Sequence, residues 1–263
     1  MLNKFLWIVM LAGITACASE PVGATEDGQE TEIVSSTSTE MEGGVAATSY
    51  LTDLTHRPAQ GLVEQFGTSA GITEETGVRP LLPIALDLIK DFEGWVAKPY
   101  NDAVGYCTIG YGHLIDLASC AVTNKIGPFL DGLTYEAGLE LLREDTIGIR
   151  QSVQEMVKVE TTPEQFGALT SFAFNVGPSK LRRSTLLRLL NEGYPDLAAK
   201  QFGRWTYAGG VELPGLITRR SCESALFTGA LQYDAQGQFS RSQCVAAGVA
   251  ASVGEAIDIE VGE

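Results

Sequence analysis

Apolar residues recur at helical spacing from residue 81, where the first clear element of the chain begins. The apolar positions are Leu81, Ile84, Ala85, Leu88, Ile89 and Phe92, and the charged residues Asp87, Lys90 and Asp91 lie on the other side. This spacing predicts an amphipathic helix. Pro83 suits its first turn and Gly94 suits its stop.

A short β region and then further helices are predicted downstream. Residues 95–115 are dense in Gly, Tyr and β-branched residues, which indicates a small hairpin or short sheet. Helices are predicted over residues 135–157, 163–176, 184–191, 195–205 and 218–228. Thr162-Pro163-Glu164 marks one helix start, and Gly177-Pro178 marks the end of that helix. This order predicts an α+β fold that is mainly α.

The first 16 residues predict an export signal. Lys4 supplies a positive charge, and the apolar run of 12 residues that follows is too short to span a bilayer comfortably. The run ends at Ile14-Thr15-Ala16-Cys17, which resembles the lipobox of bacterial lipoproteins, so we expect lipidation of Cys17. Two alternatives remain. Cleavage by ordinary signal peptidase would release a soluble secreted protein, and an uncleaved segment would itself be the anchor.

The net charge of −15 belongs mostly to the flanks of the chain. Residues 18–80 hold 11 acidic and 2 basic residues, and residues 233–263 hold 5 acidic and 1 basic residue. We therefore expect a disordered acidic linker over 17–80, a folded catalytic domain over 81–232 and a loosely structured acidic tail over 233–263. Nucleic-acid binding is not expected, because phosphate contacts need clustered Lys and Arg.

Cysteine usage agrees with export. Beyond Cys17 the chain holds four cysteines, namely Cys107, Cys120, Cys222 and Cys244. An even number in an exported chain suggests disulfides, and closeness in sequence favours the pairs 107–120 and 222–244. Other pairings and free thiols remain open. A metal site is less favoured, because the chain has no C-x-x-C and only two histidines.

A carboxylate at a helix end, followed by a glycine-rich segment, is the main chemical feature. Glu93 ends the first helix, Asp102 follows nine residues later in a polar turn, and Thr108 follows after six more. Glycoside hydrolysis needs two carboxyl groups, of which one keeps its proton in an apolar setting. Phe92 and Trp95 could provide that setting for Glu93. Taken singly, such residues are more often a solvated glutamate and a turn-capping aspartate.

The longer string resembles the phage-type lysozymes, glycoside hydrolase family 24. The resemblance rests on Glu93-Gly94, Pro99 to Asp102 and Gly105 to Leu114, and it continues through 171–177, 204–205, 214–216 and 219–220. It covers about residues 81–232. It implies a two-lobed lysozyme-like fold with a small β lobe and a helical C-terminal lobe. The implied reaction is hydrolysis of the β-1,4 bond between N-acetylmuramic acid and N-acetylglucosamine in peptidoglycan, without metal or organic cofactor.

The resemblance also implies roles for single residues. Glu93 would protonate the leaving oxygen, Asp102 would assist water attack or stabilise positive charge, and Thr108 would position the water. Inversion is the expected outcome, with carboxyl groups roughly 6.5–9.5 Å apart. The remaining matches are Leu114, Phe174 and Asn175 in the sugar cleft, His113 as a structural residue paired with a carboxylate, and Arg219, with Arg220 as the alternative, as a cation beside Glu93.

We therefore expect a monomeric, exported and membrane-tethered muramidase. The acidic composition disfavours electrostatic attraction to an anionic wall, and a tether would supply local concentration instead. One rival is a peptidoglycan-binding lipoprotein that kept the fold and lost activity. Another is a chitinase-like activity on N-acetylglucosamine polymers.

Overall fold

The computed structural model describes residues 77–246 and 254–263. The predicted export signal, Cys17 and nearly all of the predicted linker lie outside these residues. Among the residues that are described, no helix has the length and apolar character needed to cross a membrane.

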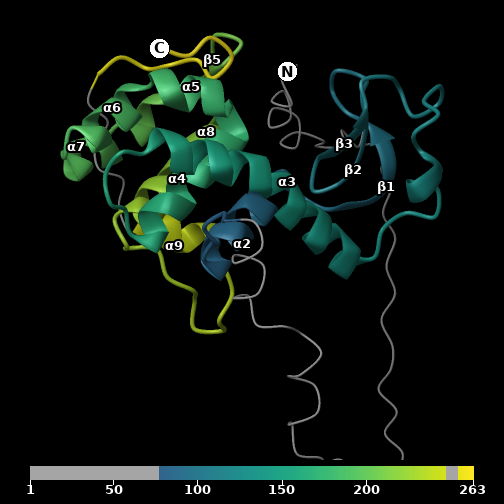
Figure 1. Ribbon diagram of the computed structural model, residues 1–263, viewed down its shortest axis with the longest axis horizontal. Coiled ribbons are helices and arrows are strands. Elements are labelled where there is room, and N and C mark those ends of the chain that lie inside the picture. The colour runs from purple at the N-terminus through teal and green to yellow at the C-terminus, as the bar shows by residue number, and fades with distance from the viewer. Residues whose placement is uncertain (1–76, 247–253) are drawn as a thin grey trace, which may run out of the picture. The chain divides into compact units, whose positions relative to one another are not determined.

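Helices dominate the described chain, and a three-stranded antiparallel sheet and a two-stranded hairpin accompany them (Figure 1). The prediction of an α+β fold that is mainly α is confirmed. In chain order the elements are α2 (Pro83–Glu93), β1 (Val96–Asn101), β2 (Cys107–Gly110), β3 (His113–Asp116), η1 (Gly127–Phe129), α3 (Tyr135–Met156), α4 (Pro163–Val176), α5 (Pro178–Arg183), α6 (Thr185–Asn191), α7 (Pro195–Ala199), η2 (Phe202–Arg204), β4 (Tyr207–Ala208), β5 (Val211–Glu212), α8 (Pro214–Phe227) and α9 (Arg241–Ala246).

Local sequence signals set several of the helix ends. Gly94 ends α2 with a φ of 73°, which favours glycine, and its N–H donates to the Lys90 carbonyl. Thr162 and Gln165 form a capping box at the start of α4, in which each side chain accepts a hydrogen bond from the other residue's backbone N–H. These caps set the end of α2, where Glu93 lies, and the start of α4.

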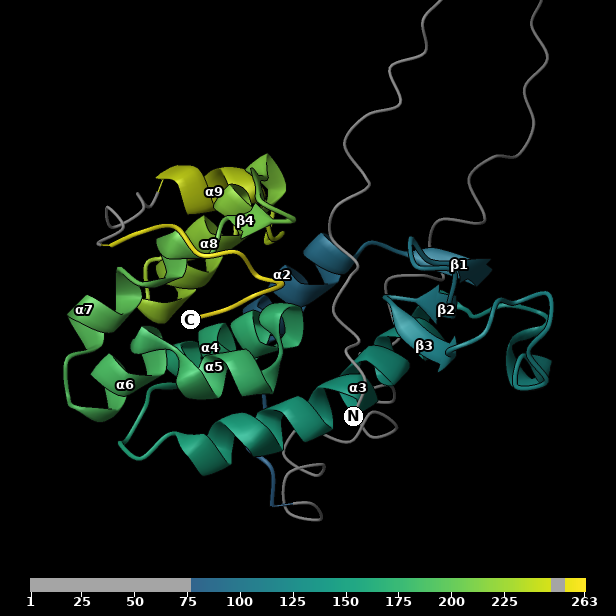
Figure 2. The ribbon, with the colours of Figure 1, turned by 90° about the horizontal axis from the view of Figure 1, so that it is seen from above.

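The sheet is a three-stranded antiparallel meander in the order β1-β2-β3. Helix α3 packs against β2 and β3 near one end and against α4 and α5 farther along. Figure 2 shows this helix running from the sheet to the remaining helices. The sheet that carries the glycine-rich motif is therefore held to the helical part of the chain by α3.

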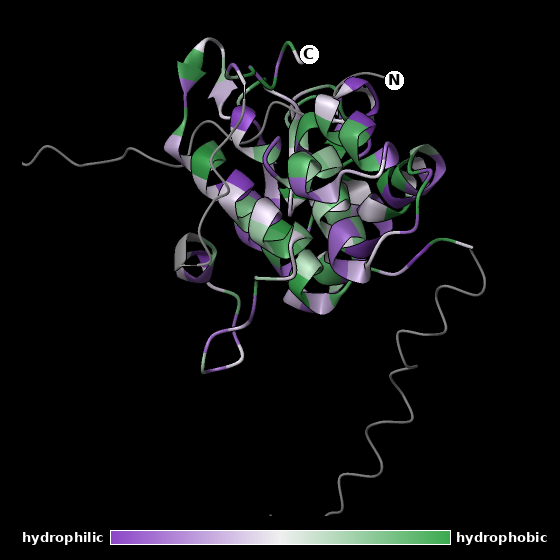
Figure 3. Ribbon diagram, turned by 90° about the vertical axis from the view of Figure 1, so that its left-hand side faces the viewer, coloured by the Kyte–Doolittle hydropathy of each residue, from purple (hydrophilic) through white to green (hydrophobic). Residues whose placement is uncertain are grey.

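Helix α4 lies in the middle of the main core, and ten of its fourteen residues are buried. Phe172 of α4 packs edge-on against Phe202 and Trp205, whose ring centroids lie 5.4 and 5.2 Å from its own. The hydrophobic segments of these packed helices are green in Figure 3, with hydrophilic segments interleaved. Burial of this kind stabilises by about 25 cal/mol per Å² of apolar surface.

Some predicted boundaries were wrong. The first helix starts at Pro83 rather than at Leu81, because Leu82 is extended. The predicted helix 195–205 divides into α7 and η2, and the last predicted helix starts at Pro214 instead of residue 218. Helix α5 and the β4–β5 hairpin were not expected. Each is only a few residues long, so neither leaves a sustained periodic pattern.

The described part of the C-terminal segment is more ordered than expected. A disulfide joins Cys222 of α8 to Cys244 of α9. Ile257 and Ile259 are buried in the main core, and Asp258 forms a parallel bridge to Tyr207. The prediction of a loosely structured tail is wrong for residues 254–263. Their apolar–acidic alternation, Ile257 to Glu260, is the period-two pattern of a segment with one buried side.

Candidate active site

Glu93 is the last residue of α2, and its side chain is only 6% exposed. Its Oε1 accepts a hydrogen bond from Arg219 at 2.8 Å. Its Oε2 lies beside Gly112, where an added Cβ would stand 3.9 Å away. Gly112 has a φ of 84° and forms the turn between β2 and β3. The glycine-rich motif therefore folds back onto the end of α2 and encloses the Glu93 carboxyl.

Burial raises the pKa of Glu93 above the ordinary value of 4.5. The positive charge of Arg219 and its hydrogen bond oppose that rise, and the negative charge of Glu223 adds to it. Desolvation is the larger effect. Glu93 thus keeps its proton over a wider pH range than a solvated glutamate, as a proton donor near neutral pH requires.

Asp102 occupies the turn between β1 and β2. Its Oδ1 accepts hydrogen bonds from the backbone N–H groups of Val104 and Tyr106, both at 2.8 Å. Its backbone N–H donates a further hydrogen bond to the Tyr106 carbonyl at 2.9 Å. These hydrogen bonds hold the side chain of Asp102 in a fixed position. Asp102 therefore caps the turn, as an isolated aspartate in a turn usually does. The same hydrogen bonds fix the orientation of its carboxylate.

The strand register places Tyr100, Thr108 and Leu114 on one face of the sheet. Tyr100 is directly opposite Thr108, and Thr108 is directly opposite Leu114. Burial raises the pKa of Tyr100, and the negative charges of Asp102 and Glu93 raise it further. Both carboxyl groups therefore lie within electrostatic range of one phenol. Tyr100 therefore lies opposite Thr108 and is close enough to Glu93 and Asp102 to feel both of their charges.

Thr108 is fully buried in this arrangement. Its hydroxyl donates to the Tyr106 carbonyl at 3.3 Å, which is long for an O–H···O hydrogen bond. Leu114 is half-buried. A threonine hydroxyl can donate one hydrogen bond and accept two. The Thr108 hydroxyl therefore keeps two acceptor positions beyond its bond to Tyr106.

A buried ionic network lies behind Glu93. Arg219 donates to Glu93 and to Glu223, the latter at 3.1 Å, and Arg220 forms a second ion pair with Glu223. Ser171 donates to Glu223 at 2.8 Å. Burial lowers the pKa of Arg220 to about 10, so Arg220 stays charged at neutral pH. Two cations and two carboxyl groups thus share one desolvated region, and Arg219 rather than Arg220 is the cation that contacts Glu93.

The other predicted residues have different environments. His113 Nδ1 lies 3.0 Å from both oxygens of Asp145, which agrees with a structural histidine paired with a carboxylate. Phe174 is partly buried and packs beside Tyr111 in a small apolar cluster. Asn175 is only 4% exposed and accepts a hydrogen bond from Arg220. Asn175 is therefore placed to support the network behind Glu93 rather than to meet a ligand directly.

The sequence interpretation missed two residues of this site. Tyr100 was noted only as part of the motif, although strand alternation places it beside Thr108. Glu223 was not singled out, although it follows Arg219 by four residues and Arg220 by three on one helix. That spacing is typical of ion pairs on one helix.

The described residues contain no group of three or more His, Cys, Asp or Glu side chains placed to hold a metal ion.

A disulfide joins Cys107 to Cys120 and fastens strand β2 directly beside Thr108. Both predicted cysteine pairings are therefore confirmed. We expect the double replacement Cys107→Ala with Cys120→Ala to lower the free energy of unfolding by about 3 kcal/mol, because a short covalent loop in the unfolded chain is released. Thermal unfolding followed by circular dichroism measures this. An unchanged melting temperature in the double variant would show that the bridge does not stabilise the sheet.

Comparison with known proteins supports one family. The family model described as phage lysozyme matches residues 90–223. The endolysin of Bacillus phage PZA is 40% identical over 144 residues, which are 54% of this chain and 52% of that protein. The endolysin of Acyrthosiphon pisum secondary endosymbiont phage 1 is 38% identical over 149 residues, which are 55% of this chain and 95% of that protein.

A solved structure agrees with the sequence relatives. The muramidase domain of SpmX from Asticaccaulis excentricus has a TM-score of 0.50 and 33% identity, over 57% of this chain and 97% of that domain. The predicted lysozyme-like fold is confirmed. The chain spans about half the length of the Bacillus phage endolysins that it matches. The matched residues include Glu93, Asp102 and Thr108, and the chain belongs to the phage lysozyme family.

Proposed function

We propose that this chain hydrolyses the β-1,4 bond between N-acetylmuramic acid and N-acetylglucosamine in peptidoglycan, with Glu93 as the proton donor. One observation carries the proposal. The carboxyl of Glu93 is nearly inaccessible to water and has a raised pKa, yet it lies beside the glycine-rich turn of the sheet that holds Asp102 and Thr108. A protonated acid beside an ionised carboxylate is the pair that glycoside hydrolysis requires. Membership of a family with endolysins and a muramidase domain supports the same substrate.

In this proposal Glu93 protonates the glycosidic oxygen as the bond to the leaving sugar breaks. Asp102 remains ionised in its turn and assists a water molecule on the opposite face of the sugar ring, and Thr108 holds that water. The outcome is inversion, because water rather than Asp102 attacks the anomeric carbon. The anomer formed first in a digest, read by proton NMR before it equilibrates, distinguishes inversion from retention. Leu114 is the residue of the shared face best placed to contact the sugar.

The test is the chemistry of the new chain ends. Purified peptidoglycan is digested with the protein, the products are reduced with borohydride, and mass spectrometry identifies the reduced sugar. Reduced muramic acid at the end of each product is the expected result. Reduced glucosamine would assign cleavage to the other glycosidic bond, and absence of any product would favour the peptidoglycan-binding rival. Parallel digestion of an N-acetylglucosamine polymer tests the chitinase-like rival, for which we expect no products.

We also propose that the chain is exported and anchored by a lipid at Cys17. The proposal rests on Lys4, the apolar run of 12 residues and the lipobox-like ending, and two disulfides agree with an oxidising compartment. We expect Cys17→Ala to move the protein from the membrane fraction to the soluble fraction and to abolish labelling by a radioactive fatty acid. The soluble secreted alternative predicts that wild type and variant partition alike.

A further inference from the structure

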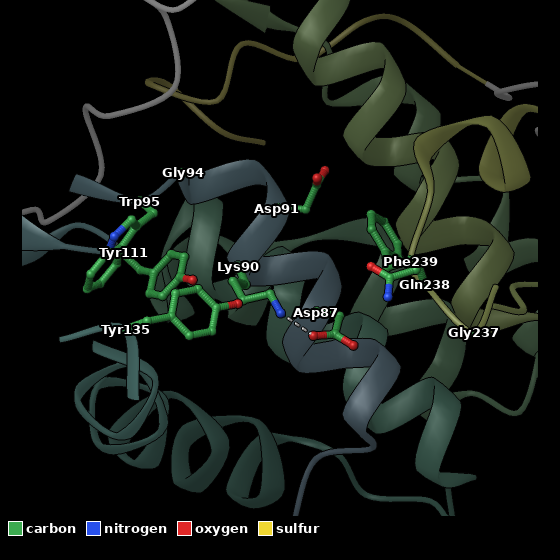
Figure 4. A pocket seen from close by; sticks show the side chains of 10 residues that line it. All are labelled: Asp87, Lys90, Asp91, Gly94, Trp95, Tyr111, Tyr135, Gly237, Gln238 and Phe239. Atoms are coloured by element: carbon green, nitrogen blue, oxygen red, sulfur yellow. Dashed lines mark hydrogen bonds and ion pairs between the residues drawn. The ribbon is translucent and has the colours of Figure 1, made fainter. Parts of the chain in front are cut away.

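A groove of about 620 Å³ lies along α2, and Glu93, Asp102 and Thr108 do not line it (Figure 4). Asp87, Lys90, Asp91 and Gly94 form its floor. Asp87, Lys90 and Asp91 stand at positions i, i+3 and i+4, so they share one face of α2, and Gly94 follows the end of the helix. The volume is within the range of about 300–1,000 Å³ that small-ligand sites occupy. The groove is therefore lined separately from the carboxyl of Glu93, although both use residues of α2.

Two walls of different origin border this floor. The aromatic residues Trp95, Tyr111 and Tyr135 form one wall, and Gly237, Gln238 and Phe239 form the other (Figure 4). The second wall lies beyond residue 223, where the match to the family model ends. This chain thus builds the groove partly from a segment that the family domain does not supply.

The loop that carries Gln238 is fixed firmly to α2. The side chain of Asp234 accepts hydrogen bonds from the backbone N–H groups of Gln236 and Gln238, both at 2.9 Å. Tyr233 donates to Asp87 at 2.8 Å, and Arg241 pairs with Asp91 at 2.6 Å. The disulfide at Cys244 holds the helix that follows. A wall held at both of its ends is a preformed surface, which lowers the entropic cost of binding a ligand.

The chemistry of the groove suits a neutral, hydroxyl-rich ligand. Tyr135 is 44% exposed, and its ring packs edge-on against Trp95 and Tyr111, with Lys90 Nζ 5.9 Å from the ring centroid. The charges balance within the groove, because Lys90 pairs with Asp87 and Arg241 pairs with Asp91. A sugar ring has apolar C–H faces that stack on aromatic rings, and its hydroxyl groups bind to carboxylate and amide groups like those of Asp91 and Gln238. A strongly charged ligand would find no unbalanced partner here.

We propose that this groove is a second saccharide site, which binds a neutral, N-acetylglucosamine-containing stretch of glycan apart from the site of cleavage. The substrate class rests on the proposed function. A second contact to the same polymer raises the effective concentration of glycan at the first. For a protein of net charge −15 on an anionic wall, such a contact provides attraction that long-range electrostatics does not.

NMR titration of the full chain carrying Glu93→Gln tests the groove directly. The ligand is the N-acetylglucosamine tetrasaccharide, which is neutral. We expect the backbone signals of Gly237 and Gln238 and the indole N–H signal of Trp95 to shift and to saturate. Loss of a hydrogen bond in Gln238→Ala should weaken this binding about fivefold. Gln236→Ala is the matched control, because Gln236 is exposed in the same loop and does not line the groove.

A second pair of variants addresses the aromatic wall. We expect Tyr135→Ala to weaken binding, and Tyr194→Ala, which removes a comparably exposed ring elsewhere, to leave it unchanged. Absence of saturable shifts at the groove signals overturns the proposal, as does equal binding by Gln238→Ala and Gln236→Ala. The signals of Gly112 and Leu114 report the cleavage site separately. Shifts there without shifts at Gly237 and Gln238 would reject the groove and keep the proposed function. Shifts at the groove signals alone would support the groove, and the peptidoglycan digest described above tests the proposed function separately.

Discussion

Replacing Glu93 with glutamine should lower hydrolysis of purified peptidoglycan by roughly 10²–10⁴-fold, the usual contribution of a general acid. Glutamine has the same shape and can still accept the hydrogen bond from Arg219, but it has no acidic proton for the leaving oxygen. The rate of release of reducing ends at saturating substrate measures the loss. Glu144→Gln makes the same change at an exposed position of α3 and should retain full activity.

The same variant should remain folded, and its stability should depend differently on pH. Burial raises the pKa of Glu93, so between 4.5 and the folded-state pKa the folded chain keeps a proton that the unfolded chain has lost. The free energy of unfolding therefore decreases as pH rises through that range. Glu93→Gln has no proton to lose and should lack this decrease. Denaturant unfolding at a series of pH values compares the two proteins. Equal rates of peptidoglycan hydrolysis by wild type and Glu93→Gln would show that Glu93 is not the proton donor.

The second large effect is expected from Glu223→Gln. Glu223 is fully buried and is the shared partner of Arg219 and Arg220, which are themselves fully buried. Removing its charge leaves two desolvated cations with too few anions, which costs about 3–5 kcal/mol. The melting temperature should fall by roughly 10 °C, measured by calorimetry.

Glu140→Gln is the matched control for the loss of an ion pair. Glu140 pairs with Arg143 at a spacing of three residues, but both side chains are about half exposed. An exposed pair contributes about 0–1 kcal/mol, so this variant should melt nearly as the wild type does. Similar melting temperatures for Glu223→Gln and Glu140→Gln would contradict the assigned role of the buried network.

Glu223→Gln should also change the pH dependence of activity, which a purely structural residue would not alter. The negative charge of Glu223 raises the pKa of Glu93. Without that charge the field of Arg219 on Glu93 is less opposed, and Glu93 should release its proton at lower pH. The alkaline limb of the pH–rate profile is therefore expected to move to lower pH. Glu223 is in this sense a positioning residue that acts through Arg219.

Local signals in the sequence predicted where Glu93 lies, and the resemblance to phage-type lysozymes assigned its catalytic role. Pro83 and Gly94 bound α2, so the position of Glu93 at a helix end follows from two residues. The spacing of the cysteines favoured the bridge beside Thr108. Strand alternation within residues 95–115 would have placed Tyr100 and Leu114 on one face with Thr108, had the register been known. Register depends on which residues pair, and a sequence read by itself leaves that open.

The back of the site depends on contacts between distant segments, which periodicity does not encode. Arg219 contacts Glu93 across 126 residues of sequence, and Ser171 reaches Glu223 across 52. The sequence left both Arg219 and Arg220 open as the cation beside Glu93, and the structure shows that the two adjacent residues have different partners. The ordered structure of residues 254–263 was not predicted for the same reason. Ile257 and Ile259 are buried in the main core, and their backbone N–H groups donate to Arg204 and Tyr207, which are distant in sequence.

The most direct test of the account is a carbon-13 NMR titration of the Glu93 side-chain carboxyl in the intact protein. The account predicts a pKa above 4.5, with the alkaline limb of peptidoglycan hydrolysis at the same pH. A Glu93 pKa at or below 4.5, in a protein that still cleaves peptidoglycan at neutral pH, would contradict it. The proton for the leaving sugar would then have to come from another group.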